Sequence, residues 1–258
     1  MTRTIILTVA GIILGGVALA LAKDRLKIKI ALKESFGAVM FVFAFGVTVI
    51  LFNVFVLKYR QQWIADIMMC VTILLLFTVL FFFRDPDRKI NGTEGGIISP
   101  ADGVIDLIEE NTKVSGIAGR AKRISIFLSL FNVHVQRMPV DGKIERLIPV
   151  EGKVLPAFLG ESSEKNRHNI YIIQGTIPVV LRQISGIVAQ RPVAWVKEGD
   201  NLKTGDRLGL IKFGSRVDIF MPADAELKAV KGQRVYGGET LLGIIAKDAV
   251  AAKTKKKA

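Results

Sequence analysis

Residues 103–108 read Gly-Val-Ile-Asp-Leu-Ile, a short β-branched run that begins at a glycine. Runs of the same kind recur through the later part of the chain, at residues 96–98, 123–130, 169–173, 179–184 and 216–221. Glycine, proline and aspartate interrupt them about every eight to twelve residues, which is the spacing of strands in an all-β domain. The segment 205–211, Gly-Asp-Arg-Leu-Gly-Leu-Ile, predicts a turn and then a further strand. We therefore expect residues 84–248 to form an all-β or β-rich domain.

The beginning of the chain has a different composition. Of the 258 residues, 50% are hydrophobic and 23% are charged, and the mean hydropathy of +0.41 is too high for an ordinary soluble domain. Three apolar segments account for the excess: residues 5–22, 36–57 and 64–83. Because a helix needs about 20 apolar residues to cross a bilayer, we expect residues 1–83 to be a membrane anchor with two or three transmembrane helices. Whether the first segment is kept in the mature protein or cleaved off stays open, since Ala20-Leu21-Ala22 also resembles a signal-peptidase site.

The charge of the chain favours an anionic bilayer as its partner. The formal net charge is +13, and the last residues, 249–258, form a basic tail. A basic excess is also typical of nucleic-acid binding, but no zinc-finger spacing, glycine-flanked aromatic strand motif or recognition-helix pattern is present. Basic residues crowd the stretch between the first two apolar segments: Lys23, Arg25, Lys27, Lys29 and Lys33. By the positive-inside tendency this stretch is cytoplasmic, so we expect the β-rich domain to face the cytoplasm at the cell membrane.

Five local strings carry chemical information. In chain order they are Phe-Phe-Arg-Asp-Pro at 82–86, Ser-Pro-Ala-Asp-Gly at 99–103, Phe-Asn-Val-His-Val-Gln-Arg-Met-Pro at 131–139, Lys-Asn-Arg-His-Asn at 165–169 and Phe-Gly-Ser at 213–215. Each string alone is a weak signal, Gly-Ser above all, but five in this order are specific. Together they resemble the phosphatidylserine decarboxylase family in its short, pyruvoyl-dependent form. The resemblance covers about residues 82–245.

The resemblance implies that the chain cuts itself between Gly214 and Ser215. In the family's reaction the Oγ of Ser215 attacks the carbonyl carbon of Gly214, and the amide becomes an ester. Glycine has no side chain to obstruct this attack and tolerates a strained turn. Loss of the α-proton of Ser215 then expels the carboxylate and leaves dehydroalanine, which hydrolyses to a pyruvoyl group and ammonia. The products are a β chain, residues 1–214, and an α chain, residues 215–258, which together form a heterodimer.

His134 and Asp102 are the catalytic partners of Ser215 that the resemblance implies. A hydroxyl is a weak nucleophile at neutral pH and needs a neighbouring base. An imidazole has an ordinary pKa of about 6.5 and exchanges protons in this range. We expect His134 to be the base, and Asp102 to hold its tautomer and stabilise its charged form as in a serine-protease triad. Taken alone, each residue has a structural explanation, because Ser215 and Asp102 suit turns and His134 suits a strand interior.

The same resemblance implies the activity of the mature enzyme. The pyruvoyl carbonyl forms a Schiff base with the amine of phosphatidylserine, and carbon dioxide leaves because the conjugated carbonyl accepts the electron pair. Protonation by His134 and hydrolysis then release phosphatidylethanolamine. Arg137, Asn166 and His168 are candidates for substrate binding. No metal is expected, because two histidines and the single Cys70 make a poor zinc set. Whether the heterodimer assembles into a homo-oligomer stays open.

The chain departs from the longer members of the family at two sites. Arg137 stands where those members carry a second histidine, and the cleavage site reads Phe-Gly-Ser-Arg at 213–216 instead of Leu-Gly-Ser-Thr. The first departure leaves open whether His134 alone serves both self-cleavage and later protonation.

Residues 195–206 favour a second hypothesis. Their Gly-Asp turns before short strands also occur in lipoyl-like barrels, and we expect lipoyl-like barrel character in the C-terminal half of the domain. Membrane-anchored adaptor proteins of bacterial export systems contain such barrels and have no catalytic activity. The adaptor hypothesis also predicts long coiled-coil heptad repeats, which the sequence lacks. A membrane-bound phosphotransferase module, with His134 as phosphate acceptor, is a third hypothesis. Only the decarboxylase should separate into two fragments on a denaturing gel.

Overall fold

The computed structural model describes residues 28–30, 40–42, 44–48, 62–153, 155, 162–186, 192–212 and 215–246. The chain forms two compact units, Met1–Asp87 and Arg88–Ala258. Three of the features expected from the sequence lie outside the described residues. They are the apolar segment 5–22, the Gly214 side of the cleavage site and the basic tail 249–258.

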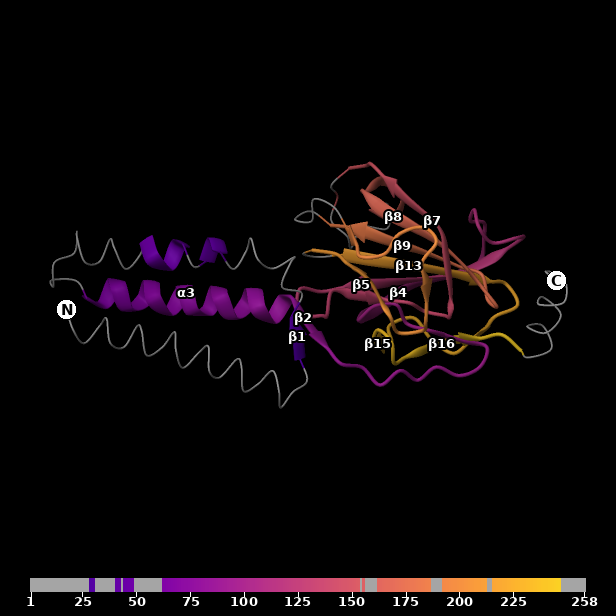
Figure 1. The fold of residues 1–258 in the computed structure, drawn as a ribbon, viewed down its shortest axis with the longest axis horizontal. Coiled ribbons are helices and arrows are strands. Elements are labelled where there is room, and N and C mark those ends of the chain that lie inside the picture. Colours follow the sequence, from indigo (N-terminus) through magenta and orange to yellow (C-terminus); the bar gives the residue numbers. More distant parts are fainter. Residues whose placement is uncertain are drawn as a thin grey trace. The chain divides into compact units, whose positions relative to one another are not determined.

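The described residues of the first unit include a long helix and a short pair of strands (Figure 1). Helix α3 spans Gln62–Phe82, and residues 40–42 and 44–48 are also helical. Strand β1, Ile28–Ile30, pairs antiparallel with β2, Arg84–Pro86.

Helix α3 exposes many apolar side chains, including Trp63, Ile67, Leu74 and Phe77. Within the part of the chain that the structure describes, however, no helix is both long and apolar enough to cross a membrane. The transmembrane helices predicted over 36–57 and 64–83 are therefore not supported. Of the first of these segments the structure describes only residues 40–42 and 44–48, which are helical. The second largely coincides with α3, which begins at Gln62 and contains Asp66.

The second unit is built on an eight-stranded sheet in which every neighbouring pair of strands is antiparallel (Figure 1). In spatial order its strands are β11 (Asn201–Leu202), β7 (Gly142–Val150), β8 (His168–Gly175), β9 (Val179–Ser185), β13 (Ser215–Pro222), β5 (Ala121–Leu128), β4 (Gly103–Thr112) and β15 (Arg234–Val235).

Two three-stranded sheets complete this unit. One has the order β10 (Val193–Ala194), β12 (Arg207–Leu210), β6 (Val135–Arg137), and the other β14 (Glu226–Leu227), β16 (Leu241–Ile244), β3 (Gly96–Ile98). The only helix in its described residues is the single turn α4, Ser162–Lys165. The prediction of a β-rich domain is confirmed, and its lipoyl-like barrel character stays a prediction.

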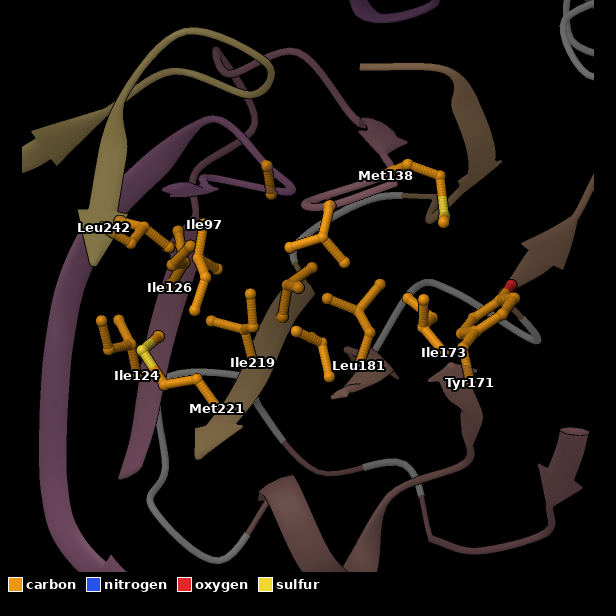
Figure 2. Close-up of a cluster of buried hydrophobic side chains, with 14 of the residues drawn as sticks. Ile97, Ile124, Ile126, Met138, Tyr171, Ile173, Leu181, Ile219, Met221 and Leu242 are labelled. Atoms are coloured by element: carbon orange, nitrogen blue, oxygen red, sulfur yellow. The ribbon is translucent and has the colours of Figure 1, made fainter. Parts of the chain in front are cut away.

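Strand β13 shows how the sequence divides the large sheet into two faces. Successive side chains of a strand point to opposite faces, and Val217, Ile219 and Met221 all enter the main apolar core. Figure 2 shows Ile219 and Met221 among side chains from β5, β8, β9 and other strands: Ile124, Ile126, Ile173, Leu181 and Leu242. This core fixes the register of β13, because a shift by one residue would move all three side chains to the other face.

The opposite face of β13 carries buried charge. Arg216 and Asp218 alternate with the core residues and are 2% and 0% exposed. The Asp218 carboxylate accepts a hydrogen bond from Arg123 at 2.8 Å, and Arg216 is paired with Asp106. Buried charges are tolerated when they are paired in this way. Apolar packing on one face and buried ion pairs on the other therefore hold strand β13 in position.

The turn predicted before residue 207 is present and requires glycine. Gly205 has a φ of 87°, in the left-handed region that favours glycine. A Cβ there would also lie 2.3 Å from Cδ1 of Ile90. The strand that follows is β12, as expected.

Candidate active site

Ser215 is the first residue of β13 and is fully buried. Its backbone is the register partner of Leu128 on one side and of Ser185 on the other. Its Oγ has no hydrogen-bond partner among the described residues. A buried hydroxyl without a partner is costly and uncommon in folded proteins. Such an atom, held at the start of a central strand, is a candidate reactive group.

His134 lies immediately before β6 and is also fully buried. Its Nδ1 lies 2.9 Å from the carbonyl oxygen of Asn132. Because a carbonyl oxygen can only accept a hydrogen bond, Nδ1 carries the proton and Nε2 is the nitrogen that can take one up. The segment before it is a tight turn, in which Oδ1 of Asn132 accepts hydrogen bonds from N and Oγ of Ser129 at 2.9 and 2.7 Å. This turn holds the carbonyl group that orients the imidazole.

The fold brings the His134 and Ser215 segments to the same end of the large sheet. Leu128, the register partner of Ser215, is the last residue of β5, and the chain runs from it directly into the turn before His134. On the other side, the backbone N–H of Ile211 donates to the carbonyl oxygen of His134 at 3.2 Å, only four residues before Ser215.

Asp102 lies at this end of the sheet as well. It directly precedes β4, whose Val104 pairs with Phe127 near the end of β5. Its carboxylate accepts hydrogen bonds from Nη2 of Arg88 at 2.9 and 2.7 Å and from the backbone N–H of Gly237 at 2.8 Å. The Asp102 and Arg88 side chains are 7% and 9% exposed, so this is a buried ion pair.

These contacts correct one expectation. Asp102 was expected to hold the imidazole of His134, but its carboxylate binds Arg88 and Gly237, and the carbonyl of Asn132 contacts Nδ1 instead. The physical reason is that Arg88 is a buried cation whose charge must be balanced, and Asp102 is the carboxylate within 3 Å of it.

Comparison with known proteins decides the family. The family model described as phosphatidylserine decarboxylase matches residues 75–243. A phosphatidylserine decarboxylase proenzyme from Carboxydothermus hydrogenoformans is 48% identical over 174 residues, which cover 67% of this chain and 82% of the relative. Proenzymes of the same name from Desulfotalea psychrophila and Syntrophus aciditrophicus are 40% and 38% identical, over 70% and 79% of this chain and 86% and 93% of theirs. The chain belongs to the phosphatidylserine decarboxylase family.

The decarboxylase match contains the three predicted catalytic residues, Ser215, His134 and Asp102. Ser215 and Asp102 lie at strands of the large sheet, and His134 precedes β6 of a three-stranded sheet. The catalytic roles of the three residues stay a prediction. Gly214, the other half of the predicted cleavage site, lies outside the described residues. Among the residues described, no group of three or more histidine, cysteine, aspartate or glutamate side chains could hold a metal ion.

Two of the predicted substrate-binding residues are bound to the backbone. The side-chain amide of Asn166 accepts from the N–H of Leu155 and donates to the carbonyls of Leu155 and Ser185, at 2.8, 2.7 and 2.7 Å. Nη1 of Arg137 donates to the carbonyl of Gly205 at 3.1 Å. In this structure the hydrogen bonds of the Asn166 amide connect the segment before α4 to the end of β9.

The third, His168, begins β8 and is nearly buried. Burial lowers the pKa of its imidazole, although the hydrogen bond of Nδ1 to the carbonyl of Asn166, at 2.7 Å, opposes this shift. His168 is therefore neutral near neutral pH. Substrate binding by Arg137, Asn166 and His168 stays a prediction.

Sequence reasoning missed Gln136. Its Nε2 donates to the carbonyl oxygen of His134 at 2.8 Å, and its side chain is fully buried. The signal was a polar residue inside the β-branched run that contains His134, at 133–137. A polar side chain that a strand buries needs a partner, and here the partner is the candidate catalytic residue.

Proposed function

We propose that this protein decarboxylates phosphatidylserine to phosphatidylethanolamine with a pyruvoyl group that it makes from Ser215 by cutting itself after Gly214. One observation supports the site above all: the buried Oγ of Ser215, unpartnered among the described residues, at the start of a strand whose register is fixed on both sides. The family match supports the reaction.

In self-cleavage, His134 takes the proton from the hydroxyl of Ser215. Its Nε2 is the basic nitrogen, because Nδ1 is committed to the carbonyl of Asn132. The same carbonyl stabilises the imidazolium that forms, since both ring nitrogens then carry a proton. Burial of both residues keeps bulk water away from the ester, so that the α-proton can be lost before hydrolysis.

The buried surroundings of Ser215 also suit the group that replaces it. A pyruvoyl group there supplies a carbonyl that takes up the electron pair when carbon dioxide leaves. The residues present fit it, because position 215 is buried between β5 and β9 and its side chain makes no hydrogen bond to the described residues. His134 then holds at Nε2 the proton that the substrate carbon needs.

The proposed α and β chains would stay together after the cut. Strand β13 belongs to the α chain, whereas its neighbours β5 and β9 belong to the β chain. Residues Ser215–Pro222 pair with Ala121–Leu128 along the whole of β13, and the apolar face of β13 is buried in the common core. A heterodimer is therefore the expected product.

We further propose that the enzyme works at the cell membrane with its β-rich unit on the cytoplasmic side. The substrate is a bilayer lipid, the chain has a net charge of +13, and α3 exposes apolar side chains such as Trp63 and Phe77, 63% and 62% exposed. Each basic group near an anionic leaflet contributes about 1 kcal/mol of attraction. The membrane fraction of expressing cells, prepared at low ionic strength, should contain the protein, and protease added to intact spheroplasts should leave the β-rich unit uncut. Recovery in the supernatant would contradict this proposal.

Intact-mass analysis of the purified protein tests the proposed function. We expect an α chain that begins at residue 215, lacks a free amino terminus and becomes heavier after borohydride reduction. Ser215→Ala should remain one chain without activity, because no hydroxyl is left to attack Gly214. His134→Ala should slow self-cleavage by about a hundredfold or more. An uncut, unmodified chain that still releases carbon dioxide from phosphatidylserine would overturn the pyruvoyl proposal.

A further inference from the structure

Leu130 and Phe131 form the exposed tip of the turn that leads to His134. Their side chains are 54% and 77% exposed, although both are large and apolar. The backbone N–H of Asn132 donates to the carbonyl of Ser129 at 3.0 Å, and Oδ1 of Asn132 accepts from N and Oγ of Ser129. These bonds close a β-turn with residues 130 and 131 at its centre. The turn therefore holds both side chains, here called the apolar tip, at the surface.

The apolar tip lies at the Ser215 end of the large sheet. Leu128, the register partner of Ser215, is the last residue of β5, and the turn begins at the next residue. Strand β4 starts at this end beside β5, as Figure 1 shows. Its first residue, Gly103, pairs with Val235 of β15. Tyr236 follows directly and is 43% exposed, so an exposed aromatic ring lies at the same end as the tip.

Lysines also lie at this end of the sheet, because β7 ends and β8 and β13 begin there. Lys153 comes three residues after β7, Lys165 three residues before β8, and Lys212 three residues before β13. Lys153 and Lys165 are exposed, and Lys212 is half-buried. The acidic residues of the same segments are Glu151 and Glu164, of which the first is already paired with an arginine. Three lysines therefore face mainly one acid, a balance that suits an anionic surface.

A bilayer accounts for this combination better than a protein partner does. Single exposed apolar residues are common on protein surfaces, but here two consecutive ones form the tip of a closed turn. At a membrane interface, apolar side chains enter the acyl boundary, tyrosine lies among the headgroups and lysine attracts anionic lipids. The amine of a lipid substrate must also reach the buried Ser215 while its acyl chains stay in the bilayer. A protein seated on the tip would keep the bilayer away from this end.

We propose that Leu130 and Phe131 insert into the bilayer surface and set the Ser215 end of the large sheet against the leaflet that holds the substrate. The inference deepens the proposed function and rests on it for its purpose, but insertion itself needs no cut after Gly214. Attachment through residues 1–83 would hold the chain at a membrane without choosing which end of the β-rich unit meets the lipid. The apolar tip makes that choice.

A polarity-sensitive fluorophore on Leu130→Cys tests insertion. The full chain also carries Cys70→Ser, so that one thiol is labelled, and Ser215→Ala, so that it stays uncut. With vesicles of phosphatidylcholine mixed with phosphatidylserine, we expect a blue shift and quenching by nitroxides on the lipid chains. The control is the same label on Ala118→Cys, which is exposed in the loop at the opposite end of β5 and should stay in water. Equal signals at the two positions, or none at position 130, would overturn the proposal.

Decarboxylation by the double variant Leu130→Gln with Phe131→Gln separates docking from chemistry. Per pyruvoyl-bearing α chain, we expect activity on phosphatidylserine in vesicles to fall about tenfold or more, because two apolar side chains no longer enter the lipid. Activity on dispersed short-chain phosphatidylserine should stay within about twofold. The matched control is Val230→Gln, which removes a side chain that is 66% exposed. Its turn precedes β15, which runs antiparallel to β4, and so lies away from the Ser215 end.

The remaining outcomes are decisive as well. An equal loss of activity on vesicles and on dispersed lipid would overturn the proposal, because the turn would then act through His134. A change of oligomeric state in the double variant, measured by light scattering, would overturn it by assigning the tip to a contact between copies. If the double variant does not fold, the labelled Leu130→Cys protein decides. Failure of the proposed function would appear differently, as an unaltered protein that is never cut, and would leave the insertion result unchanged.

Discussion

The carbonyl oxygen of Asn132 lies 2.9 Å from Nδ1 of His134, so a neutral backbone group orients the imidazole. In serine proteases a carboxylate has this task and strongly stabilises the imidazolium. Hydrogen bonds to charged groups are roughly twice as strong as those between neutral groups. A neutral acceptor therefore holds the tautomer without binding an acquired proton as firmly, which suits the two proposed roles of His134, taking a proton in self-cleavage and giving one in decarboxylation.

Replacing Asp102 tests whether its carboxylate serves the fold or the imidazole. In Asp102→Asn the buried guanidinium of Arg88 loses its partner, with only Glu239, 3.7 Å from Nη1, remaining as a carboxylate. We expect a loss of about 3 kcal/mol in the free energy of unfolding, the lower end of the range for breaking a buried pair. Urea unfolding of the uncut Ser215→Ala protein measures this without interference from cleavage. If Asp102→Asn instead keeps its stability and abolishes self-cleavage, Asp102 belongs to a triad with His134.

The turn at Asn132 gives a second prediction. Asn132→Ala removes the Oδ1 that accepts from N and Oγ of Ser129, so the turn loosens and the carbonyl that orients His134 moves. Self-cleavage should slow by about tenfold to a hundredfold. Asn132→Asp keeps a side-chain oxygen that can accept both hydrogen bonds from Ser129 and is the matched control. It should cut at nearly the unaltered rate, with its pH midpoint raised because a nearby negative charge favours the imidazolium. Equal defects in the two variants would contradict a role for the turn.

The sequence predicts a strand correctly where the pattern that defines the strand is local. The alternation in residues 216–221 predicts a strand, and β13 confirms it because one set of side chains enters the core and the other forms buried ion pairs. Strand β7, Gly142–Val150, was not predicted. Charged residues and a proline interrupt the alternation of apolar and polar side chains in this segment. The fold tolerates them because β7 pairs on one edge with the two-residue strand β11 alone and exposes several side chains.

The pairing of the site residues could not be read from the sequence. Arg88 and Asp102 are separated by 14 residues with no periodic pattern that links them. Gln136 and Gln183 meet only because β6 and β9, which belong to different sheets, pack together, and no local rule gives that distance. The resemblance to a family named the candidate reactive residues, whereas their hydrogen-bond partners required the tertiary structure.

His168 predicts how stability depends on pH. Burial lowers the pKa of its imidazole, and the nearby charge of Arg182 acts in the same direction, whereas the hydrogen bond to Asn166 and the charge of Asp218 oppose it. In the unfolded chain the pKa is about 6.5, so below this pH the unfolded state binds the proton more readily. The contribution of His168 is therefore complete above about pH 6.5 and is lost as the pH falls toward the lower pKa of the folded state.

Thermal unfolding at about pH 7.5 and about pH 5.5 measures this contribution. His168→Asn is the comparison, because the asparagine amide can still donate to the carbonyl of Asn166 but does not titrate. The unaltered protein should lose more stability between the two pH values than the variant does. Equal losses would show that His168 titrates alike in the folded and unfolded states.

Gly209→Ala should disturb the hydrogen bonds that connect Gln183, through Gln136, to the backbone of His134. The new Cβ would lie 2.2 Å from the carbonyl oxygen of Val193 and 2.8 Å from Nε2 of Gln183, so both must move. Overpacking of this kind costs about 1 to 3 kcal/mol, and displacement of the Gln183 amide should weaken its bond to Gln136 and lower the rate of decarboxylation per pyruvoyl group. Gly92→Ala is the control, because its nearest neighbour is Thr204 at 3.9 Å and its backbone is not in the left-handed region. If Gly209→Ala loses stability but decarboxylates as fast as Gly92→Ala, the position of Gln183 has no bearing on His134.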